Sequence, residues 1–199
     1  GLCLLLYPLV SDAWNGWRHD RLVGDYDADV AEVSQDDNSR WFDAAEAYNR
    51  TLVGKGVPDA FALVAPEESA AYEAQIAFRD DGMMGYLEVP RMGQTLPIYH
   101  GTSEATLARG VGHLVGSALP VGGASTHCVL SAHRGLPSAA LFTDLDKLAL
   151  GDRFYVHVLG KTLAYEVDQV LTVDPDDTAS LDVEPGADLV TLVTCTPYG

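Results

Sequence analysis

The sequence has few cysteines, and their spacing excludes two usual ways of stabilising a small domain. Its 199 residues contain three, Cys3, Cys128 and Cys195. They form no Cys-x-x-Cys pair and show no ligand-like spacing to histidine, so neither a disulfide framework nor a zinc site is indicated. A chain of this length can bury a sizeable core without such cross-links. We expect one domain, with at most an appended segment.

Basic residues are also scarce. Against 29 aspartates and glutamates there are only 12 lysines and arginines, and the formal net charge is -17. A field of this sign repels phosphate backbones and anionic lipid headgroups. Nucleic acid is therefore not an expected partner.

The sequence lacks an apolar run long enough to cross a bilayer. Residues 1–10 are apolar and uncharged, but a membrane-spanning helix needs about 20 such residues. Two interpretations fit residues 1–10. They form a buried N-terminal strand or helix, or they are the trimmed end of a longer apolar segment with Tyr7 near the membrane interface.

Helical periodicity dominates the chain before Gly82. Apolar residues recur at spacings of three and four within residues 22–33, with charged residues between them, which predicts an amphipathic helix. A second short helix is expected over residues 40–52, after a polar break at residues 36–39 that supplies helix caps. We therefore predict an N-terminal helical region over residues 21–81.

After Gly82 the pattern changes to short strands separated by turns. Strand-like segments lie at residues 85–90, 95–99, 112–116, 126–135, 152–159, 162–173 and 188–194. One helical turn is predicted at residues 106–109 and a short helix at residues 141–148. Short strands with a turn about every ten residues argue for an antiparallel-rich barrel or sandwich. The expected fold class is therefore mainly β, with the N-terminal helices as a cover.

The last predicted strand carries a cysteine where it meets a turn. An apolar, β-branched run reaches Cys195 and is followed at once by Thr-Pro-Tyr-Gly. A cysteine in mid-strand would be a packing residue, whereas one at a strand end has both rigidity and access. From its position alone, Cys195 is either a reactive thiol or a structural one.

A cysteine nucleophile needs a histidine, which is usually distant in sequence. The histidines available are His19, His100, His113, His127, His133 and His157. His127 adjoins Cys128, but neighbouring strand residues point to opposite faces, so that pair cannot cooperate. His157 lies in mid-strand, which is typical of a histidine satisfied within a sheet. His133 stands where a strand ends, as Cys195 does, and two strand ends on one barrel rim would bring imidazole and thiol together.

Several sequence blocks resemble the sortases. Residues 191–199 look like the catalytic cysteine signature of that family, and residues 130–135 resemble its histidine block. The class C, pilin-polymerising branch is resembled in particular by residues 96–102, 112–114, 119–123 and 141–146, the last followed by residues 151–152. The match runs from about Gly82 to the end, with the motifs in the same order. The resemblance implies a sortase-type closed β-barrel of about eight strands.

The resemblance also implies a division of the chain. Residues 1–10 would end an apolar, membrane-proximal segment, residues 11–20 would form a lid loop, residues 21–81 the helical region, and residues 82–199 the catalytic barrel. Class C sortases carry a lid with an Asp-Pro-aromatic motif, whose acid pairs with the catalytic arginine and whose ring covers the cysteine. Asp12-Ala13-Trp14 fits, except that alanine replaces the proline whose fixed φ pre-orders such a loop. Composition alone predicts instead that Trp14 and Trp17 anchor on the core.

The activity that the resemblance implies is that of a cysteine transpeptidase of a Gram-positive bacterium. It would act at the extracellular face of the cell membrane, anchored through segments outside this chain. Cys195 would be the nucleophile and His133 its acid/base partner, and Thr194 and His100 are candidates for positioning the substrate. The enzyme would cleave an LPxTG-like sorting signal of a pilin subunit between Thr and Gly, through a thioacyl intermediate that a pilin lysine resolves. No metal or other cofactor is implied.

The third catalytic residue of the family is an arginine shortly after the cysteine, where it stabilises the oxyanion or positions substrate. No arginine occurs between Cys195 and Gly199, and Arg134 cannot replace it by motif correspondence. We therefore expect the 199-residue piece alone to be inactive or nearly so. Robust cleavage of a sorting-signal peptide by this piece would contradict the expectation.

Two other functions stay open at this point. One is a cysteine hydrolase of peptide or acyl substrates that uses water in place of lysine; products formed with and without an amine acceptor distinguish it. The other is a non-catalytic β-barrel adhesion module that binds Ca²⁺ through the acidic residues of 144–146 or 174–177. Neither segment has an EF-hand pattern, and solvated acidic turns explain both. A calcium-dependent rise in melting temperature that survives Cys195→Ala would favour the adhesion module.

Overall fold

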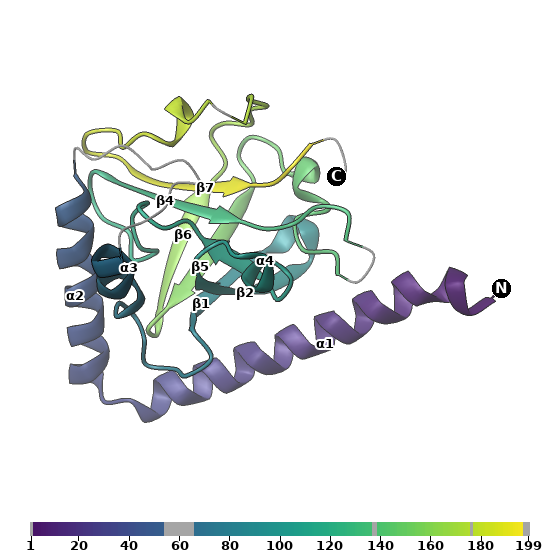
Figure 1. Cartoon of the computed structure of the whole chain (residues 1–199), viewed down its shortest axis with the longest axis horizontal. Helices are drawn as coiled ribbons and strands as arrows, with labels where there is room; N and C mark the ends of the chain where they lie inside the picture. The colour runs from purple at the N-terminus through teal and green to yellow at the C-terminus, as the bar shows by residue number, and fades with distance from the viewer. Residues whose placement is uncertain (1, 54–65, 137–138, 176, 197–199) are drawn as a thin grey trace.

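A curled seven-stranded sheet forms the body of the molecule, in a computed structural model that describes residues 2–53, 66–136, 139–175 and 177–196. The strands are β1 (Met83–Val89), β2 (Gln94–His100), β3 (Val111–His113), β4 (Thr126–Ser131), β5 (Arg153–Val158), β6 (Lys161–Glu166) and β7 (Asp188–Val193). The helices are α1 (Leu2–Glu32), α2 (Gln35–Leu52), α3 (Pro66–Glu73) and α4 (Glu104–Leu107), with 3-10 turns η1 (Pro90–Met92), η2 (Leu145–Lys147) and η3 (Ala179–Leu181). Figure 1 shows α1 and α2 along two sides of the sheet.

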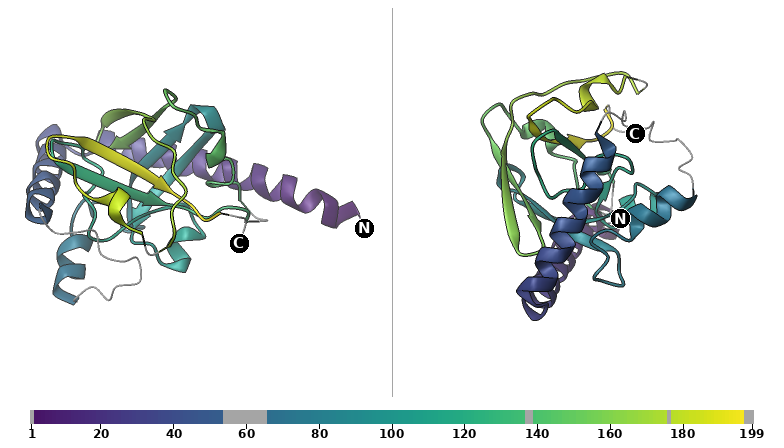
Figure 2. Two further views of the ribbon diagram at one scale, coloured as in Figure 1. Left: turned by 90° about the horizontal axis from the view of Figure 1, so that it is seen from above. Right: turned by 90° about the vertical axis from the view of Figure 1, so that its left-hand side faces the viewer.

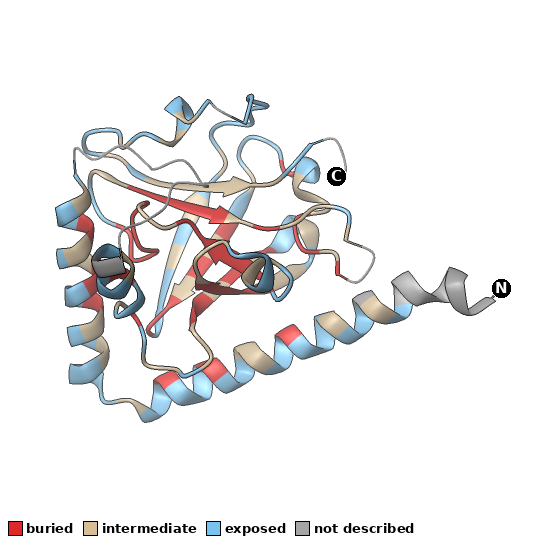
Figure 3. Ribbon diagram, in the orientation of Figure 1, coloured by how far each residue is buried: buried red, intermediate tan, exposed pale blue. Residues whose placement is uncertain are grey.

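The sheet has the strand order β6-β5-β1-β2-β3-β4-β7 and forms a nearly closed barrel. Two neighbouring pairs, β2–β3 and β4–β7, are parallel, and the others are antiparallel. The edges β6 and β7 are linked through side chains, since the Tyr165 hydroxyl donates to Asp188 Oδ1 at 2.9 Å. The buried residues concentrate on the barrel strands (Figure 3). The mainly β barrel expected from the sequence is confirmed, with seven strands in the described part of the chain.

Helix α1 differs most from the sequence-based expectation. The lid loop expected at residues 11–20 lies within one continuous helix, Leu2–Glu32. The local reason is that Ala13 is a strong helix former at the position where a proline would have ended the helix. The first half of α1 projects beyond the barrel (Figures 1 and 2). In the described part of the chain, no helix has the length and apolar character that a bilayer span requires.

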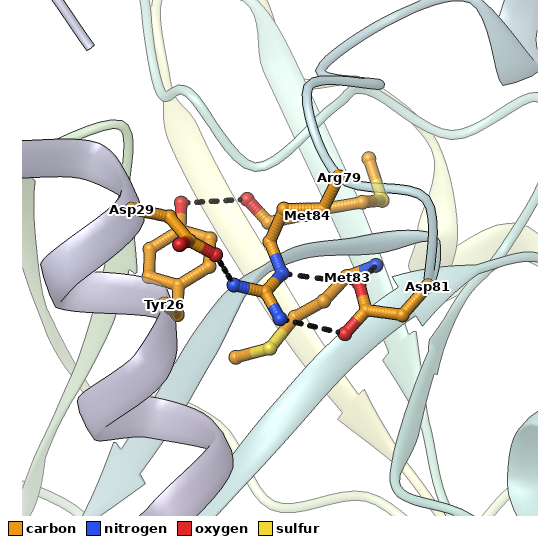
Figure 4. A network of polar contacts seen from close by, with 6 residues as sticks. All are labelled: Tyr26, Asp29, Arg79, Asp81, Met83 and Met84. Atoms are coloured by element: carbon orange, nitrogen blue, oxygen red, sulfur yellow. Dashed lines mark hydrogen bonds and ion pairs between the residues drawn. The ribbon is translucent and has the colours of Figure 1, made fainter. Parts of the chain in front are cut away.

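The second half of α1 packs on the barrel through Tyr26, which is 1% exposed. Its hydroxyl donates to the Met84 carbonyl at 2.9 Å (Figure 4). The same hydroxyl accepts from the Leu159 N–H, also at 2.9 Å. Burial is the largest influence on the Tyr26 pKa and raises it, so the phenol stays neutral. One side chain of α1 thereby satisfies backbone groups of two barrel segments that are distant in sequence.

Arg79 makes a second connection between α1 and the barrel (Figure 4). Its guanidinium forms an ion pair with Asp29 of α1 and another with Asp81, the latter at 2.9 Å. The Asp81 carboxylate also accepts from the Met83 N–H at 3.0 Å, where β1 begins. Burial acts to raise the pKa of Asp81, but the hydrogen bonds from Arg79 and Met83 outweigh it, and the pKa lies below its ordinary value.

Helix α2 begins earlier than predicted, and the polar break at residues 36–39 is part of the helix. Ser34 is the N-cap, because its hydroxyl accepts from the Asp37 N–H at 3.1 Å. The buried Asn49 side chain exchanges two hydrogen bonds with Leu119, donating to its carbonyl at 3.1 Å and accepting from its N–H at 2.7 Å. The Asn49 amide therefore makes the two backbone hydrogen bonds that a neighbouring strand would otherwise make with Leu119, in the turn after β3.

Other predicted boundaries also shift. The strand expected over residues 162–173 ends at Glu166, because its ladder partner β5 begins only at Arg153. The strand expected over residues 126–135 ends at Ser131. The helix expected over residues 141–148 is reduced to the 3-10 turn η2, and the turn expected at residues 106–109 is α4.

Candidate functional site

The two predicted site residues lie just beyond the ends of the parallel pair β4–β7. The ladder runs from Thr126 opposite Asp188 to Ser131 opposite Val193, and the Ala132 N–H donates to the Val193 carbonyl at 3.2 Å beyond it. Extending this register by two residues places His133 opposite Cys195. Neighbouring strands lie about 4.8 Å apart. Both residues therefore follow the ends of neighbouring strands at one rim of the barrel.

Side-chain alternation assigns both residues to the outer face of this strand pair. Cys128, Leu130 and Ala132 belong to the barrel core, and Val190 and Leu192 pack against it. The residues between them therefore point outward.

His127 demonstrates this common outer face directly. Its Nε2 lies 2.6 Å from the Thr191 hydroxyl of β7, and its Nδ1 lies 2.8 Å from the Asp182 carbonyl. His133 and Cys195 have the same parity as His127 and Thr191, so they share this face. The prediction that His127 and Cys128 face opposite sides of the sheet is confirmed.

The two cysteines with described side chains have opposite environments. Cys195 is exposed and in no disulfide. Cys128 is 3% exposed in the core, and burial raises the pKa of its thiol far above the ordinary value. A thiolate is the reactive form of cysteine. Of these two thiols, only Cys195 is placed to react with a solute.

The backbone after His133 is fixed by a turn that the sequence alone did not single out as part of the site. The His133 carbonyl accepts from the Phe142 N–H at 3.1 Å, and the Gly135 N–H donates to the Thr143 hydroxyl at 3.0 Å. Arg134 pairs with Asp146 at 2.7 Å. These contacts stiffen the strand exit that carries the imidazole, and only the likeness of residues 141–146 to a family block pointed to them.

Thr194 links the same two strand ends. Its hydroxyl donates to the Ala132 carbonyl at 2.8 Å. Thr194 thus contacts the residue directly before His133 and itself directly precedes Cys195.

His100, the other candidate for positioning substrate, lies elsewhere. It ends β2, which is separated from β7 by β3 and β4 in the sheet order. Its Nε2 is 2.7 Å from the Gln75 carbonyl and its Nδ1 is 3.2 Å from the Gly82 carbonyl. The structure does not bring this ring together with Cys195.

The predicted lid residues lie on α1. Trp14 is 62% exposed and Trp17 is 52% exposed, and their rings contact each other with centroids 5.3 Å apart. The expectation that these rings anchor on the core is wrong, because the part of α1 that carries them projects beyond the barrel. Asp12 lies in α1, and its side chain is outside the described residues.

The acidic segment at residues 144–146 is occupied by ion pairs. Asp144 pairs with Lys147 at 2.7 Å, and Asp146 with Arg134. Across the described residues, no three side chains of the metal-ligating types come together. Asp176 of the other acidic segment lies outside the described residues.

His157 has the role predicted from its mid-strand position. Its Nε2 lies 3.0 Å from Glu88 Oε2, its Nδ1 lies 3.0 Å from the Thr162 hydroxyl, and its ring stacks on Tyr86 at 4.3 Å. Both ring nitrogens are satisfied within the sheet.

The barrel carries an exposed cysteine just beyond β7 and a histidine just beyond β4. The chain belongs to the sortase family: the family model described as the sortase domain matches residues 87–199. Its solved structural relatives include class C sortases, and the agreement extends well beyond the barrel.

Sortase C1 from Streptococcus agalactiae matches with a TM-score of 0.85 and 45% identity, over 90% of this chain and 91% of that one. Sortase C from Streptococcus pneumoniae matches with a TM-score of 0.80 and 40% identity, over 89% of each chain. Sortase C-1 from Actinomyces oris matches with a TM-score of 0.77 and 44% identity, over 81% of this chain and 91% of that one.

Curated relatives match over a shorter part of the chain. Sortase D of Bacillus subtilis (strain 168) is 32% identical over 114 residues, and sortase A of Streptococcus agalactiae serotype III (strain NEM316) is 28% identical over 117 residues. Each match covers 57% of this chain. The chain spans about half the length of these relatives, 54% and 47%.

Proposed function

We propose that the protein is a cysteine transpeptidase that cleaves an LPxTG-like sorting signal between Thr and Gly and joins pilin subunits by isopeptide bonds. The observation that carries the proposal is the parallel register of β4 and β7, from which we infer that His133 lies opposite the exposed Cys195. The pilin substrate is supported by the Streptococcus pneumoniae relative, whose structure is described in terms of pilin substrate specificity.

The proposed reaction has two transfers at one carbonyl. The Cys195 thiolate attacks the threonine carbonyl carbon of the signal, the C–S bond forms, and the C–N bond to glycine breaks. His133 gives a proton to the leaving glycine amine. A pilin lysine amine then attacks the thioester, the C–N bond forms, and the C–S bond breaks. His133 takes the proton that the lysine loses, and the enzyme returns to its starting state.

We infer that pilin subunits are the partners and that the enzyme acts in pilus assembly at the extracellular face of the cell membrane, anchored there in the full-length protein. The family relationship supports this location. The acidic surface implied by the net charge of -17 agrees with an acceptor that presents a lysine.

Peptide transfer tests the proposed function in the full-length protein. With an LPxTG-like peptide we expect a thioacyl adduct on Cys195 and release of the C-terminal piece, both detected by mass spectrometry. A lysine-bearing pilin peptide should then convert the adduct to an isopeptide-linked product. Cys195→Ala should abolish both species, whereas Cys128→Ala should retain the adduct, because Cys128 is buried in the core. A free carboxylic acid as the sole product, whatever the amine concentration, would instead identify a hydrolase.

We also propose that Asp12 and Trp14 act as a lid over Cys195. In the helical form of α1 the Trp14 ring is 62% exposed, so covering the thiol requires a second conformation in which residues 11–20 unwind. Ala13 in place of proline makes such a loop less pre-ordered.

Removing the Trp14 ring is therefore expected to speed alkylation of Cys195 by a few-fold, in proportion to the time that the lid is closed. The rate with iodoacetamide is compared between the wild type and Trp14→Ala, with Trp17→Ala as the matched control. Equal rates in all three proteins would remove Trp14 from the lid.

A further inference from the structure

We propose that Thr191 and Thr194 are positioning residues that hold Cys195 in register with His133, one from each face of β7. The inference rests on the proposed function, since it concerns the same cysteine and histidine. It assigns to Thr194 a role toward the protein itself in place of contact with substrate.

On the inner face, the Thr194 hydroxyl continues the ladder where the backbone stops. The last backbone bond of the pair runs from the Ala132 N–H to the Val193 carbonyl at 3.2 Å. The next acceptor along β4 is the Ala132 carbonyl, and it receives the Thr194 hydroxyl at 2.8 Å. Alternation places Thr194 on the same side as Leu192, which packs on the core. A substrate held at Cys195 on the outer face is on the other side of the strand.

On the outer face, Thr191 makes the equivalent bond through His127. A carbonyl only accepts, so the ring nitrogen facing the Asp182 carbonyl at 2.8 Å, Nδ1, carries the proton. Nε2 is then the acceptor, and the Thr191 hydroxyl donates to it at 2.6 Å. His127 is 3% exposed, so this bond is shielded from water. The bond from Thr191 ties β7 to β4, and the same His127 ring ties β4 to Asp182 in the connection between β6 and β7.

The backbone ladder alone cannot specify this register. Backbone hydrogen bonds are the same for every residue type, so a shifted pairing of two strands keeps most of them. A slip of one residue would turn Cys195 to the inner face, and a slip of two would move it about 7 Å from His133. Within the described part of the chain, β7 has a ladder partner only in β4. The bonds of Thr191 and Thr194 exist in one register alone, which is the physical reason to assign them this role.

The pH profile of thiol alkylation tests the assignment in the 199-residue chain. The rate constant of Cys195 with iodoacetamide is measured from pH 5 to pH 9, with peptide mapping to locate the label. In the wild type the profile reports the pairing of Cys195 with His133, and His133→Gln supplies the unpaired reference. We expect Thr194→Val to lower the rate near pH 7 by about 3- to 10-fold, as the loss of one register-specific hydrogen bond predicts, and to move the profile toward that reference.

Conservative and matched variants separate positioning from general destabilisation. Thr194→Ser keeps the hydroxyl and should restore the wild-type profile, and Thr191→Val with Thr191→Ser should behave in the same way from the outer face. Thr95→Val makes the same chemical change on β2 and should leave the profile unchanged. Should Thr194→Val fail to fold, the Thr191 pair carries the same test.

Two results would overturn different claims. A wild-type profile in Thr194→Val and Thr191→Val, with a raised KM and unchanged kcat for the peptide in the full-length protein, would make them substrate contacts and end the positioning assignment. Identical profiles for the wild type and His133→Gln would instead show that Cys195 and His133 are not paired. That outcome removes the proposed function itself.

Discussion

His133→Gln in the full-length protein is expected to slow acyl transfer at Cys195 by about 10²- to 10⁴-fold, the usual contribution of a positioned acid/base group. The reason is that the His133 imidazole is the group proposed to protonate the leaving amine and to deprotonate the attacking lysine. Glutamine keeps the size and polarity of the side chain but cannot exchange a proton. The measurement is kcat/KM for an LPxTG-like peptide, at saturating and at limiting concentrations of the amine acceptor.

The matched control is His157→Gln, a histidine that also lies on a barrel strand. Its ring nitrogens contact Glu88 and Thr162, on the opposite side of the strand order from β4 and β7. This variant should keep kcat/KM within about threefold of the wild type, apart from any loss of folded protein. A similar loss of kcat/KM in both variants would show that the assay does not report proton transfer by His133.

Acidification from pH 6.5 to pH 4 is expected to lower the free energy of unfolding by about 3 kcal/mol through His113 alone. This side chain is 0% exposed, with Nδ1 2.9 Å from the Tyr72 hydroxyl and Nε2 2.8 Å from the Ala118 carbonyl. Burial lowers its pKa from 6.5 to about 4, and the contact with the Ala118 carbonyl offsets only part of that effect.

The direction follows from the proton balance. Between pH 6.5 and pH 4 the unfolded chain binds a proton at His113 and the folded chain does not. The contribution of His113 to the free energy of unfolding is therefore complete above pH 6.5 and is lost as the pH falls toward 4. Asp81 acts in a different window, because its pKa is lowered from 3.8 and its contribution is lost only below that value.

Urea unfolding at intervals from pH 7.5 to pH 4.5 checks this prediction without interference from Asp81. His113→Gln, which can still donate and accept one hydrogen bond, should be less stable at pH 7.5 but should lose most of the slope between pH 6.5 and pH 4.5. His127→Gln serves as the comparison, since its ring is also buried. An unchanged slope in His113→Gln would assign the acid sensitivity to other groups.

Local rules of chain geometry account for much of this protein. The alternation of side chains along a strand separates His127 from Cys128, and the strand-end positions of His133 and Cys195 follow from the turn residues that come after them. Residues 11–20 were expected to form a loop and are helical instead. Residues 11–20 contain no proline to stop a helix, so they continue α1.

Contacts between distant segments needed the tertiary structure. Nothing in the sequence states that Tyr26 caps two barrel segments, that Asn49 serves as a strand partner for Leu119, or that His113 is the fully buried imidazole. Each of these contacts depends on which surfaces meet when the whole chain packs. Short sequence patterns do not specify contacts between distant segments.

The sequence by itself determined the residue types of the site, the strand ends that carry them, and the family to which they point. Only the tertiary structure decided that β4 and β7 are parallel neighbours and that their register pairs Ser131 with Val193, two residues before His133 and Cys195. The physical reason is that alternation and turns act over a few neighbouring residues, whereas register depends on pairing across the barrel. There the bonds of Thr191 and Thr194 distinguish one alignment from the next.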